Sequence, residues 1–297
     1  MTNACGACGG TTLVPHLRLA HHFGLDSLVP TTDRHGSAFS DLVRCAACGH
    51  IQLARFPSAP ELAEAYGEAE SEDYVEEEAG QRATARTALG RIERHREPGR
   101  LLDLGCWVGF LLAEASDRGW EPTGVEPSEF ASRFARERLG LNVLHAGLDD
   151  ADLPARAFDA VVMADVIEHL PDAAFALDRV ASLLAADGVL YLALPNAGSR
   201  VARALGPRSW SVIPTHVHYF TRSSLFTLLR RRGFTPLWAG TAPKAFTARY
   251  YLERLGGYSP PLARGLVGAA SAGGVAERML APDFRDRMAV VARGPLK

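Results

Sequence analysis

Features typical of membrane, secreted and nucleic-acid-binding proteins are absent from this 297-residue sequence. No stretch approaches the roughly 18 consecutive apolar residues that a membrane-spanning helix needs, so we expect no membrane association. The first ten residues, MTNACGACGG, contain no basic segment followed by an apolar run, so we expect no signal peptide. With a net charge of −2, the chain has no overall positive charge that would attract nucleic acid. These absences favour a cytoplasmic monomer or homodimer with a small-molecule partner.

Cysteine is scarce, but four of the five residues form two CxxC pairs, Cys5 with Cys8 and Cys45 with Cys48. In a reducing cytoplasm such pairs are metal ligands more often than disulfides. Four thiolates complete a closed tetrahedral Zn(II) site, so we expect structural zinc. Glycine follows the second cysteine of each pair, as in zinc knuckles. We do not expect the histidines of this region to be ligands: His16, His21, His22, His35 and His50.

The chain divides into three zones by composition. Residues 1–57 form the expected zinc-ribbon-like domain, and residues 58–97 are charged and helix-prone, which indicates a largely solvated helical linker. Residues 98–297 alternate apolar strands with helices, which predicts an α/β fold with a parallel sheet covered on both faces. The expected strands are 100–104, 123–126, 141–146, 159–165, 189–195, 234–240 and 287–294, and the expected helices are 109–119, 128–140, 172–186 and 223–233.

The stretch DLGCWVG ends the first of these strands and has the form of a cofactor-binding loop. The pattern acid-x-G-x-G-x-G is matched by Asp103, Gly105 and Gly109, whereas the dinucleotide pattern G-x-G-x-x-G is matched only once. Ligands of parallel sheets bind beyond the carboxyl ends of the strands, where a glycine turn and a helix N-terminus offer free N–H groups. Glu126 ends the second strand, where a carboxylate accepts hydrogen bonds from both ribose hydroxyls.

Trp107 stands where this loop pattern has its second glycine. A tryptophan is tolerated there if its φ is negative, and it is strained if its φ is positive. Two roles remain open for the indole. It can face the cofactor pocket and exclude water, or it can pack on the following helix.

Four segments, LLDLGCWVGFLL, GVEPS, FDAVVMADVIEHLPD and GVLYLALPN, together resemble class I S-adenosylmethionine-dependent methyltransferases. The similarity covers residues 100–295 and is greatest to the bacterial group that acts on sugars, lipids and secondary metabolites. It implies a Rossmann-like seven-stranded sheet whose last strand is antiparallel, with S-adenosylmethionine as cofactor and S-adenosylhomocysteine as product. It also implies a cofactor site formed by Asp103, Gly105, Cys106, Trp107, Gly109, Glu126 (ribose), Gly147, Leu148 and Asp149 (adenine), and Asp165 (reacting centre).

The N-terminal pattern CxxC…CAACGHIQL, followed by Tyr66 and Tyr74, resembles the zinc domain of deoxysugar C-methyltransferases. In that group a tyrosine of the connecting region reaches the cofactor, which implies this role for Tyr74. A Tyr-x-Glu-His segment of the same group corresponds here to SWSVIPTHVHYFT, and its histidine, which looks like the catalytic base, falls on His216. Ile213 and Thr215 replace the tyrosine and the glutamate, which argues against a ketosugar substrate.

Three histidines are therefore candidate general bases, because neutral imidazole accepts protons near pH 7. His216 and His218 alternate along the chain, so in an extended segment both side chains point the same way. His169, directly after Glu168, is the third candidate. A purely structural, hydrogen-bonded histidine is the competing interpretation for each.

The leading hypothesis is methyl transfer to a small molecule such as a sugar, a glycan or a secondary metabolite. An RNA base methyltransferase with a zinc module is the second hypothesis, although basic–aromatic runs are lacking. Transfer of the aminocarboxypropyl arm and a non-catalytic binder with Trp107 as a plug are the remaining alternatives. Residues 241–285 interrupt the last strand pair, and we expect them to form a helical insertion over the active site.

Overall fold

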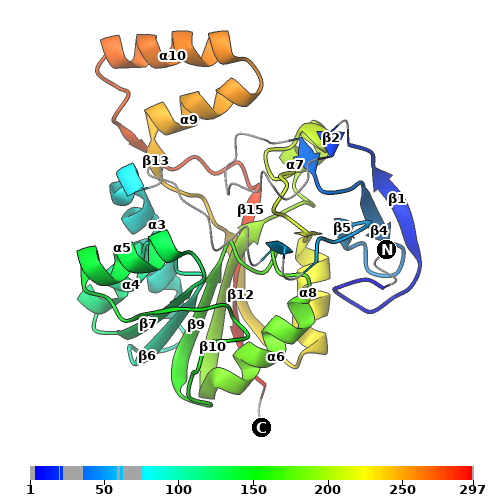
Figure 1. Ribbon diagram of the computed structural model, residues 1–297, viewed down its shortest axis with the longest axis vertical. Helices are drawn as coiled ribbons and strands as arrows, with labels where there is room; N and C mark the ends of the chain where they lie inside the picture. The colour runs from blue at the N-terminus through cyan, green and yellow to red at the C-terminus, as the bar shows by residue number, and fades with distance from the viewer. Residues whose placement is uncertain (1–3, 20, 23–35, 59–60, 63–74, 296–297) are drawn as a thin grey trace.

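The computed structural model describes residues 4–19, 21–22, 36–58, 61–62 and 75–295, and a seven-stranded sheet lies at its centre (Figure 1). The strands are arranged in the order β12-β15-β10-β9-β6-β7-β8, and only β15 is antiparallel to its neighbours. This confirms the expected methyltransferase-type sheet. The strands are β6 (Arg100–Leu104), β7 (Glu121–Glu126), β8 (Val143–His145), β9 (Phe158–Ala164), β10 (Leu184–Pro195), β12 (Thr235–Thr241) and β15 (Arg287–Arg293).

Helices cover both faces of this sheet, as the continuous apolar strands predict. On one face lie α3 (Glu78–Ile92), α4 (Phe110–Asp117) and α5 (Glu129–Leu139), and on the other lie α6 (Ala173–Leu183) and α8 (Arg222–Arg231) (Figure 1). Adjacent residues of β6 show the two-sided burial. Leu101 belongs to the apolar cluster under α3 and α4, whereas Leu102 belongs to the cluster under α6 and α8, and both are fully buried.

Residues at the helix termini determine both ends of α5, but they do not determine the C-terminal end of α6. Ser128 caps α5 by accepting a hydrogen bond from the Ala131 N–H, and Gly140 ends it in a left-handed conformation with φ +67°. Helix α6 was expected to reach residue 186, but it ends at Leu183. The reason is tertiary, because Leu184 already pairs with Phe158 of β9 in the sheet.

Helix α3 occupies the segment that the sequence marks as a solvated linker, yet one side of it is buried. Leu89 and Ile92 are fully buried against the sheet and α4, while the opposite side carries exposed residues. Arg82 and Arg86 of α3 both reach Glu114 of α4. The helix is therefore a packed cover of the sheet.

The zinc-ribbon-like region contributes a second sheet in the order β1-β4-β5-β11. Its strands are β1 (Leu13–Leu17), β4 (Leu42–Cys45), β5 (Ile51–Leu53) and β11 (His218–Tyr219). The last strand comes from the distant half of the chain, with His218 opposite Gln52 and Tyr219 opposite Ile51. A short parallel pair, β2 (His21–His22) with β3 (Ser37–Ala38), lies beside this sheet. The two halves of the chain are thus joined by backbone hydrogen bonds.

The segment between β12 and β15 is helical, as expected, but most of it stands away from the sheet (Figure 1). Its base contacts α3, where the Ala245 N–H donates to Thr84 Oγ1 at 2.9 Å. Its elements are β13 (Phe246–Thr247), α9 (Ala248–Arg254), η4 (Leu255–Gly257), α10 (Pro260–Ala272) and β14 (Met279–Leu280). The short helices α7 (Arg200–Leu205) and η3 (Gly206–Arg208) follow β10. No described helix is long and apolar enough to cross a bilayer.

Candidate functional site

The loop after β6 has the tight backbone that a cofactor cradle needs. Gly105 has φ +70°, and a Cβ there would lie 2.6 Å from the Val166 side chain. Gly109 has φ +85°, and a Cβ there would lie 2.7 Å from Leu141. Glycine is therefore required at both positions, because any other side chain would be strained and would clash. The bend brings backbone N–H groups to the carboxyl edge of the sheet.

Glu126 is buried beside this loop at the end of β7, with 5% of its surface exposed. Its Oε2 accepts the Trp107 N–H at 2.8 Å and its Oε1 accepts the Ser128 N–H at 2.9 Å. Burial raises the pKa of Glu126, and these two N–H groups oppose that rise. Each carboxylate oxygen keeps a lone pair, so the oriented carboxylate can also accept both hydroxyls of a ribose.

Asp103 lies at the end of β6, within electrostatic range of Glu126. It is 4% exposed, and burial together with the Glu126 charge raises its pKa well above the usual range. The same burial applies to Cys106, whose Sγ would lie 2.6 Å from a Cβ at Gly124 of β7. The Cys106 side chain therefore packs into the sheet, and only its backbone is placed to line a cofactor.

Trp107 adopts φ +49°, so the tryptophan at the glycine position is strained. Its indole ring packs on Phe130 of α5, with ring centroids 6.3 Å apart, and belongs to an apolar cluster that also includes Phe110 of the following helix α4. The indole Nε1–H is buried and has no hydrogen-bond partner among the described residues. The loop thus accepts a large side chain by turning it outward onto the neighbouring helix.

The expected adenine segment follows β8, the strand next to Glu126. Glu126 pairs with His145 across the sheet, and the turn of Gly147, Leu148 and Asp149 begins two residues later. This turn therefore lies one strand beyond the ribose carboxylate. Tyr74, the remaining cofactor candidate, lies outside the described residues.

Asp165 directly follows β9, on the other side of the loop, and has φ +58°. Its Oδ2 lies 2.7 Å from Lys244 Nζ, and its Oδ1 is paired with Arg287. Burial would raise the pKa of Asp165, but these two cations outweigh it and hold the pKa below the usual range. Asp165 was a candidate site residue from the sequence, but Lys244 and Arg287 were not, because both lie far along the chain from it.

Glu168, His169 and His216 form a buried group next to Asp165, which we call the Glu168 cluster. One ligand atom from each of the three lies within 4.8 Å of the others. Nδ1 of His169 bonds to the Thr215 carbonyl at 3.0 Å, and Nδ1 of His216 bonds to the Ser211 carbonyl at 2.8 Å. Glu168 is 1% exposed, and neither carboxylate oxygen has a hydrogen-bond partner among the described residues.

Burial shifts the pKa of each member in the direction that favours its neutral form: upward for the carboxyl group and downward for the imidazoles. The pKa of Glu168 rises to about 8, through burial and then the Asp165 charge. The pKa of His169 falls to about 4 through burial, and that of His216 falls well below its usual value through burial and its neighbour His169.

His218 does not join this cluster, contrary to the expectation that it points the same way as His216. The turn at Pro214 and Thr215 precedes both histidines, but the N–H groups of Val217 and His218 both donate to the Glu168 carbonyl, so the backbone between the histidines does not alternate as in a regular strand. Nδ1 of His218 lies 3.0 Å from Nε2 of His50, and its Nε2 lies 3.3 Å from the Pro171 carbonyl. Both ring nitrogens are engaged at the junction with the zinc-ribbon-like sheet, an arrangement that fits the structural interpretation of this histidine.

The four paired cysteines converge, and none of the five cysteines forms a disulfide. Cys5 Sγ lies 3.6 Å from Cys48 Sγ, and Cys8 Sγ lies 3.6 Å from Cys45 Sγ. Four thiolates at about 2.3 Å from one Zn(II) would lie about 3.8 Å apart, so the geometry fits tetrahedral zinc. His50 lies in the junction with His218 and not in this group.

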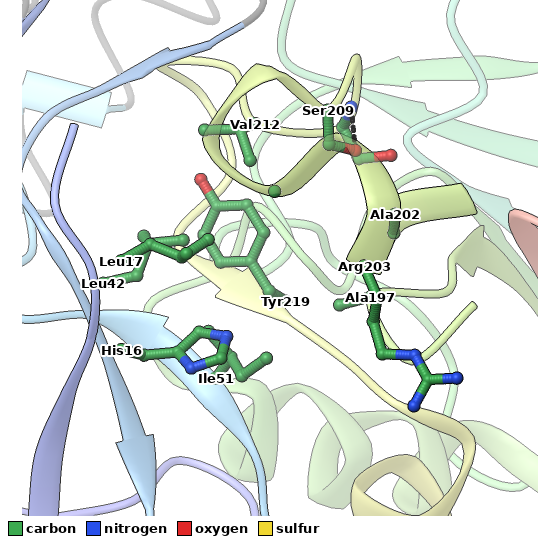
Figure 2. Close-up of a pocket in the computed structure, with 12 residues that line it drawn as sticks. His16, Leu17, Leu42, Ile51, Ala197, Ala202, Arg203, Ser209, Val212 and Tyr219 are labelled. Atoms are coloured by element: carbon green, nitrogen blue, oxygen red, sulfur yellow. Dashed lines mark hydrogen bonds between the residues drawn. The ribbon is translucent and has the colours of Figure 1, made fainter. Parts of the chain in front are cut away.

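A cavity of about 140 Å³ lies between the zinc-ribbon-like sheet and α7 (Figure 2). Leu17, Leu42 and Val212 give it an apolar wall, and Tyr219 projects into it with a buried hydroxyl that has no partner among the described residues. The Tyr219 ring lies 6.2 Å from that of His216. A second cavity, of about 330 Å³, lies beyond β10 and β12 and is lined by polar residues that include Asn196 and Arg287.

Comparison with known proteins agrees with this geometry. A family model described as a methyltransferase domain matches residues 74–238, which is more than half of the chain. The chain belongs to this methyltransferase-domain family. The match includes the cofactor loop, Glu126, Asp165 and the Glu168 cluster.

Individual relatives cover less of the chain. A ubiquinone biosynthesis O-methyltransferase from Nitrobacter winogradskyi is 35% identical over 104 residues, covering 33% of this chain and 39% of the relative. One from Alkalilimnicola ehrlichii is 37% identical over 116 residues, covering 36% and 44%. The alignments thus span well under half the length of these curated relatives.

Solved structures support the fold. A Burkholderia thailandensis 1,6-didemethyltoxoflavin-N1-methyltransferase with bound 1,6-didemethyltoxoflavin and S-adenosylhomocysteine is 18% identical, with TM-score 0.52 over 85% of this chain and 97% of that one. A SAM-dependent methyltransferase from Thermotoga maritima is 19% identical, with TM-score 0.51 over 75% and 94%. At these identities the likeness concerns the fold alone.

Proposed function

We propose that this methyltransferase-family chain transfers a methyl group from S-adenosylmethionine to a small-molecule acceptor. The observation that carries the proposal is the buried Glu126 carboxylate, oriented by two backbone N–H groups at the carboxyl edge of the sheet. A carboxylate in that place holds a ribose by both hydroxyls. The family match and the fold support the same cofactor.

Different residues bind different parts of the cofactor. Asp103 and the Gly105 loop line the methionine end, Glu126 takes the ribose, and the turn that begins at Gly147 borders the adenine. S-adenosylmethionine supplies an electrophilic methyl group on a sulfonium. The chain must hold the acceptor in line with that group, and such positioning lowers the barrier by several kcal/mol. Asp165, fixed by Lys244 and Arg287, forms the wall on the acceptor side.

The acceptor is proposed to be a small organic molecule, reached in the cytoplasm by a monomer or homodimer. Relatives named for ubiquinone O-methylation and for toxoflavin N-methylation support this class. The acidic net charge of −2 disfavours RNA, the second candidate. If an imidazole removes the acceptor proton, it belongs to His169 or His216, whose Nδ1 atoms bond to backbone carbonyls.

We also propose that Cys5, Cys8, Cys45 and Cys48 hold one structural Zn(II). The four sulfurs are placed for tetrahedral coordination, and a site closed by four thiolates has no position for a substrate. Zinc would therefore act on folding and not on the methyl-transfer step.

Calorimetric titration with S-adenosylmethionine and S-adenosylhomocysteine tests the cofactor assignment. We expect micromolar binding, weakened at least tenfold by Glu126→Gln, because the neutral amide loses the charged hydrogen bonds to the ribose. Glu129→Gln, three residues along on the exposed side of α5, is the matched control and should bind as the unchanged chain does. Absence of binding by folded protein, or equal binding by Glu126→Gln, would refute the proposal.

A screen of acceptors follows once binding is established. Nucleotide sugars and phenolic compounds are tested first, each for formation of S-adenosylhomocysteine. Single-stranded RNA is included, and methylation of RNA alone would favour the second candidate. His169→Ala and His216→Ala should lower turnover and leave S-adenosylmethionine affinity unchanged.

A further inference from the structure

The Glu168 carboxylate is the least satisfied polar group described in the molecule. It is 1% exposed, and both its oxygens lack a hydrogen-bond partner within the part of the chain that the structure describes. A buried carboxylate without a partner is costly, and native proteins compensate for it with a hydrogen bond, a counter-charge or a metal ion. Two imidazoles have a ring nitrogen within 4.8 Å of this carboxylate, so a ligand that carboxylate and imidazole can share would complete the site.

We infer that Glu168, His169 and His216 form a binding site for a divalent cation. Their three candidate ligand atoms already lie within 4.8 Å of one another. Nδ1 of each imidazole bonds to a backbone carbonyl, Thr215 for His169 and Ser211 for His216. Histidine ligands of metals are held in this way, because the second-shell hydrogen bond fixes the orientation of the ring.

The donor set defines the class of cation. One carboxylate and two imidazoles suit Mn²⁺, Fe²⁺, Co²⁺, Ni²⁺ or Zn²⁺, whereas Mg²⁺ and Ca²⁺ prefer oxygen ligands. Three protein ligands leave coordination positions open, unlike the closed site of four cysteines. The two sites therefore differ in chemistry. The site of four cysteines would hold its ion without an open position, whereas the Glu168 cluster would leave positions on its ion for an exogenous ligand.

The charges around the cluster identify Glu168 as the anionic ligand. Asp165, the nearest other carboxylate, is already paired with Lys244 and Arg287. Those two cations exceed the charge of Asp165 by one and weaken the attraction for a further cation. We therefore expect micromolar and not nanomolar affinity, together with competition at high ionic strength.

The role that we infer for this ion depends on the proposed methyl transfer. Asp165 and the Glu168 cluster lie on the acceptor side of the sheet edge, so an acceptor hydroxyl can occupy an open coordination position. The ion lowers the pKa of that hydroxyl, and its proton passes to water. The oxygen then forms a bond to the methyl carbon while the carbon–sulfur bond breaks, releasing S-adenosylhomocysteine. His169 and His216 would act as ligands here, and not as bases.

Mn²⁺ titration of protein that carries one zinc per chain and no excess zinc, followed by electron paramagnetic resonance of free Mn²⁺, tests the site directly. We expect one Mn²⁺ per chain, with affinity reduced at least tenfold in Glu168→Gln and in His216→Asn. Glu114→Gln is the control, because Glu114 is also buried but is paired with Arg82 and Arg86. Stabilisation by Mn²⁺ in thermal melts, lost in Glu168→Gln, is the second readout and needs no catalysis.

Absence of Mn²⁺ binding to folded wild-type protein, or equal binding by Glu168→Gln, would overturn the inference. S-adenosylmethionine is titrated into the same samples. If S-adenosylmethionine binds and Mn²⁺ does not, the cation site is wrong and the methyltransferase proposal stands. If S-adenosylmethionine fails to bind, the methyltransferase proposal is wrong whatever Mn²⁺ does.

Discussion

At the scale of single residues, Trp107 illustrates how the loop departs from its usual pattern. The residue keeps the left-handed backbone of the glycine that it replaces, with φ +49°. Its indole packs against Phe130, which offsets part of the backbone strain, while Nε1–H stays buried without a partner among the described residues. The cofactor loop retains its shape, and the indole lies on α5.

Replacing Trp107 by phenylalanine tests this balance. The ring contact with Phe130 is kept and the unpaired N–H is removed, so the free energy of unfolding should rise by about 1 kcal/mol. Urea denaturation of cofactor-free protein measures the change. A loss of stability would mean that the indole N–H has a partner in solution, and Trp120→Phe, which removes a bonded N–H, serves as the opposite control.

Asp159 provides a pH-dependent test at the same scale. It pairs with Arg96 and accepts the Arg100 N–H at 2.9 Å. Burial alone would raise the pKa of Asp159, but these partners outweigh it and lower the pKa. A depressed pKa contributes stability above the unfolded value, near pH 4, and that contribution disappears as the pH falls through the folded value.

Asp159→Asn should therefore cost about 1 kcal/mol of unfolding free energy at pH 7. The difference from wild type should stay constant down to about pH 5 and shrink below about pH 4. Denaturant titrations at a series of pH values measure it. A difference that grows on acidification would contradict the assignment.

At the scale of elements, α3 and α10 show that the composition of a helix does not decide how much of it is buried. Helix α3 looks like a solvated linker in the sequence, yet it buries Leu89 completely. Helix α10 is the more apolar of the two, yet it buries only Ala263 and leaves Leu262 54% exposed. Whether a helix covers the core depends on where the chain places it, because each has neighbours on only part of its surface.

Truncation of a leucine in each helix measures this difference. Leu89→Ala should lower the free energy of unfolding by about 2–4 kcal/mol, because it opens a cavity between α3 and the sheet. Leu262→Ala, the matched change on α10, should lie within about 0.5 kcal/mol of wild type. Denaturant unfolding with equal m-values compares them, and equal losses would refute the packing of α3.

At the scale of the whole molecule, the two halves of the chain share one sheet and one polar junction. Strand β11 completes the sheet that begins with β1, and His218 contacts His50 in the zinc-ribbon-like region. The same stretch of chain carries His216 to the Glu168 cluster. We therefore expect a change in the zinc-ribbon-like region to affect the position of His216 through this backbone pairing.

Removal of zinc should destabilise the whole molecule and not the N-terminal region alone. We expect a chelator to lower Tm by several degrees while a single transition is kept, because β5 and β11 unfold together. Calorimetry before and after chelation, with zinc content measured by a colorimetric assay, checks this. Cys5→Ala should reproduce the effect and Cys106→Ala should retain one zinc per chain. Two separate transitions would show that the halves are independent.

The local features of this protein could be predicted from its sequence. The glycine turn at Gly105 and Gly109, the Ser128 cap and the apolar strands depend on residues adjacent in the chain, and all appear close to where they are expected. The grouping of the four cysteines also followed, since the two CxxC pairs allow little else. Steric limits on the backbone and the period of side chains act over a few residues, and a sequence displays them directly.

Only the tertiary structure decided which distant residues meet. Lys244 reaches Asp165, and His216 joins Glu168 and His169 while its near neighbour His218 turns to His50. The early end of α6 and the buried side of α3 have the same origin, because pairing and packing with remote elements overrode local preference. Such contacts depend on how the elements pack around the sheet, and no local pattern encodes that arrangement.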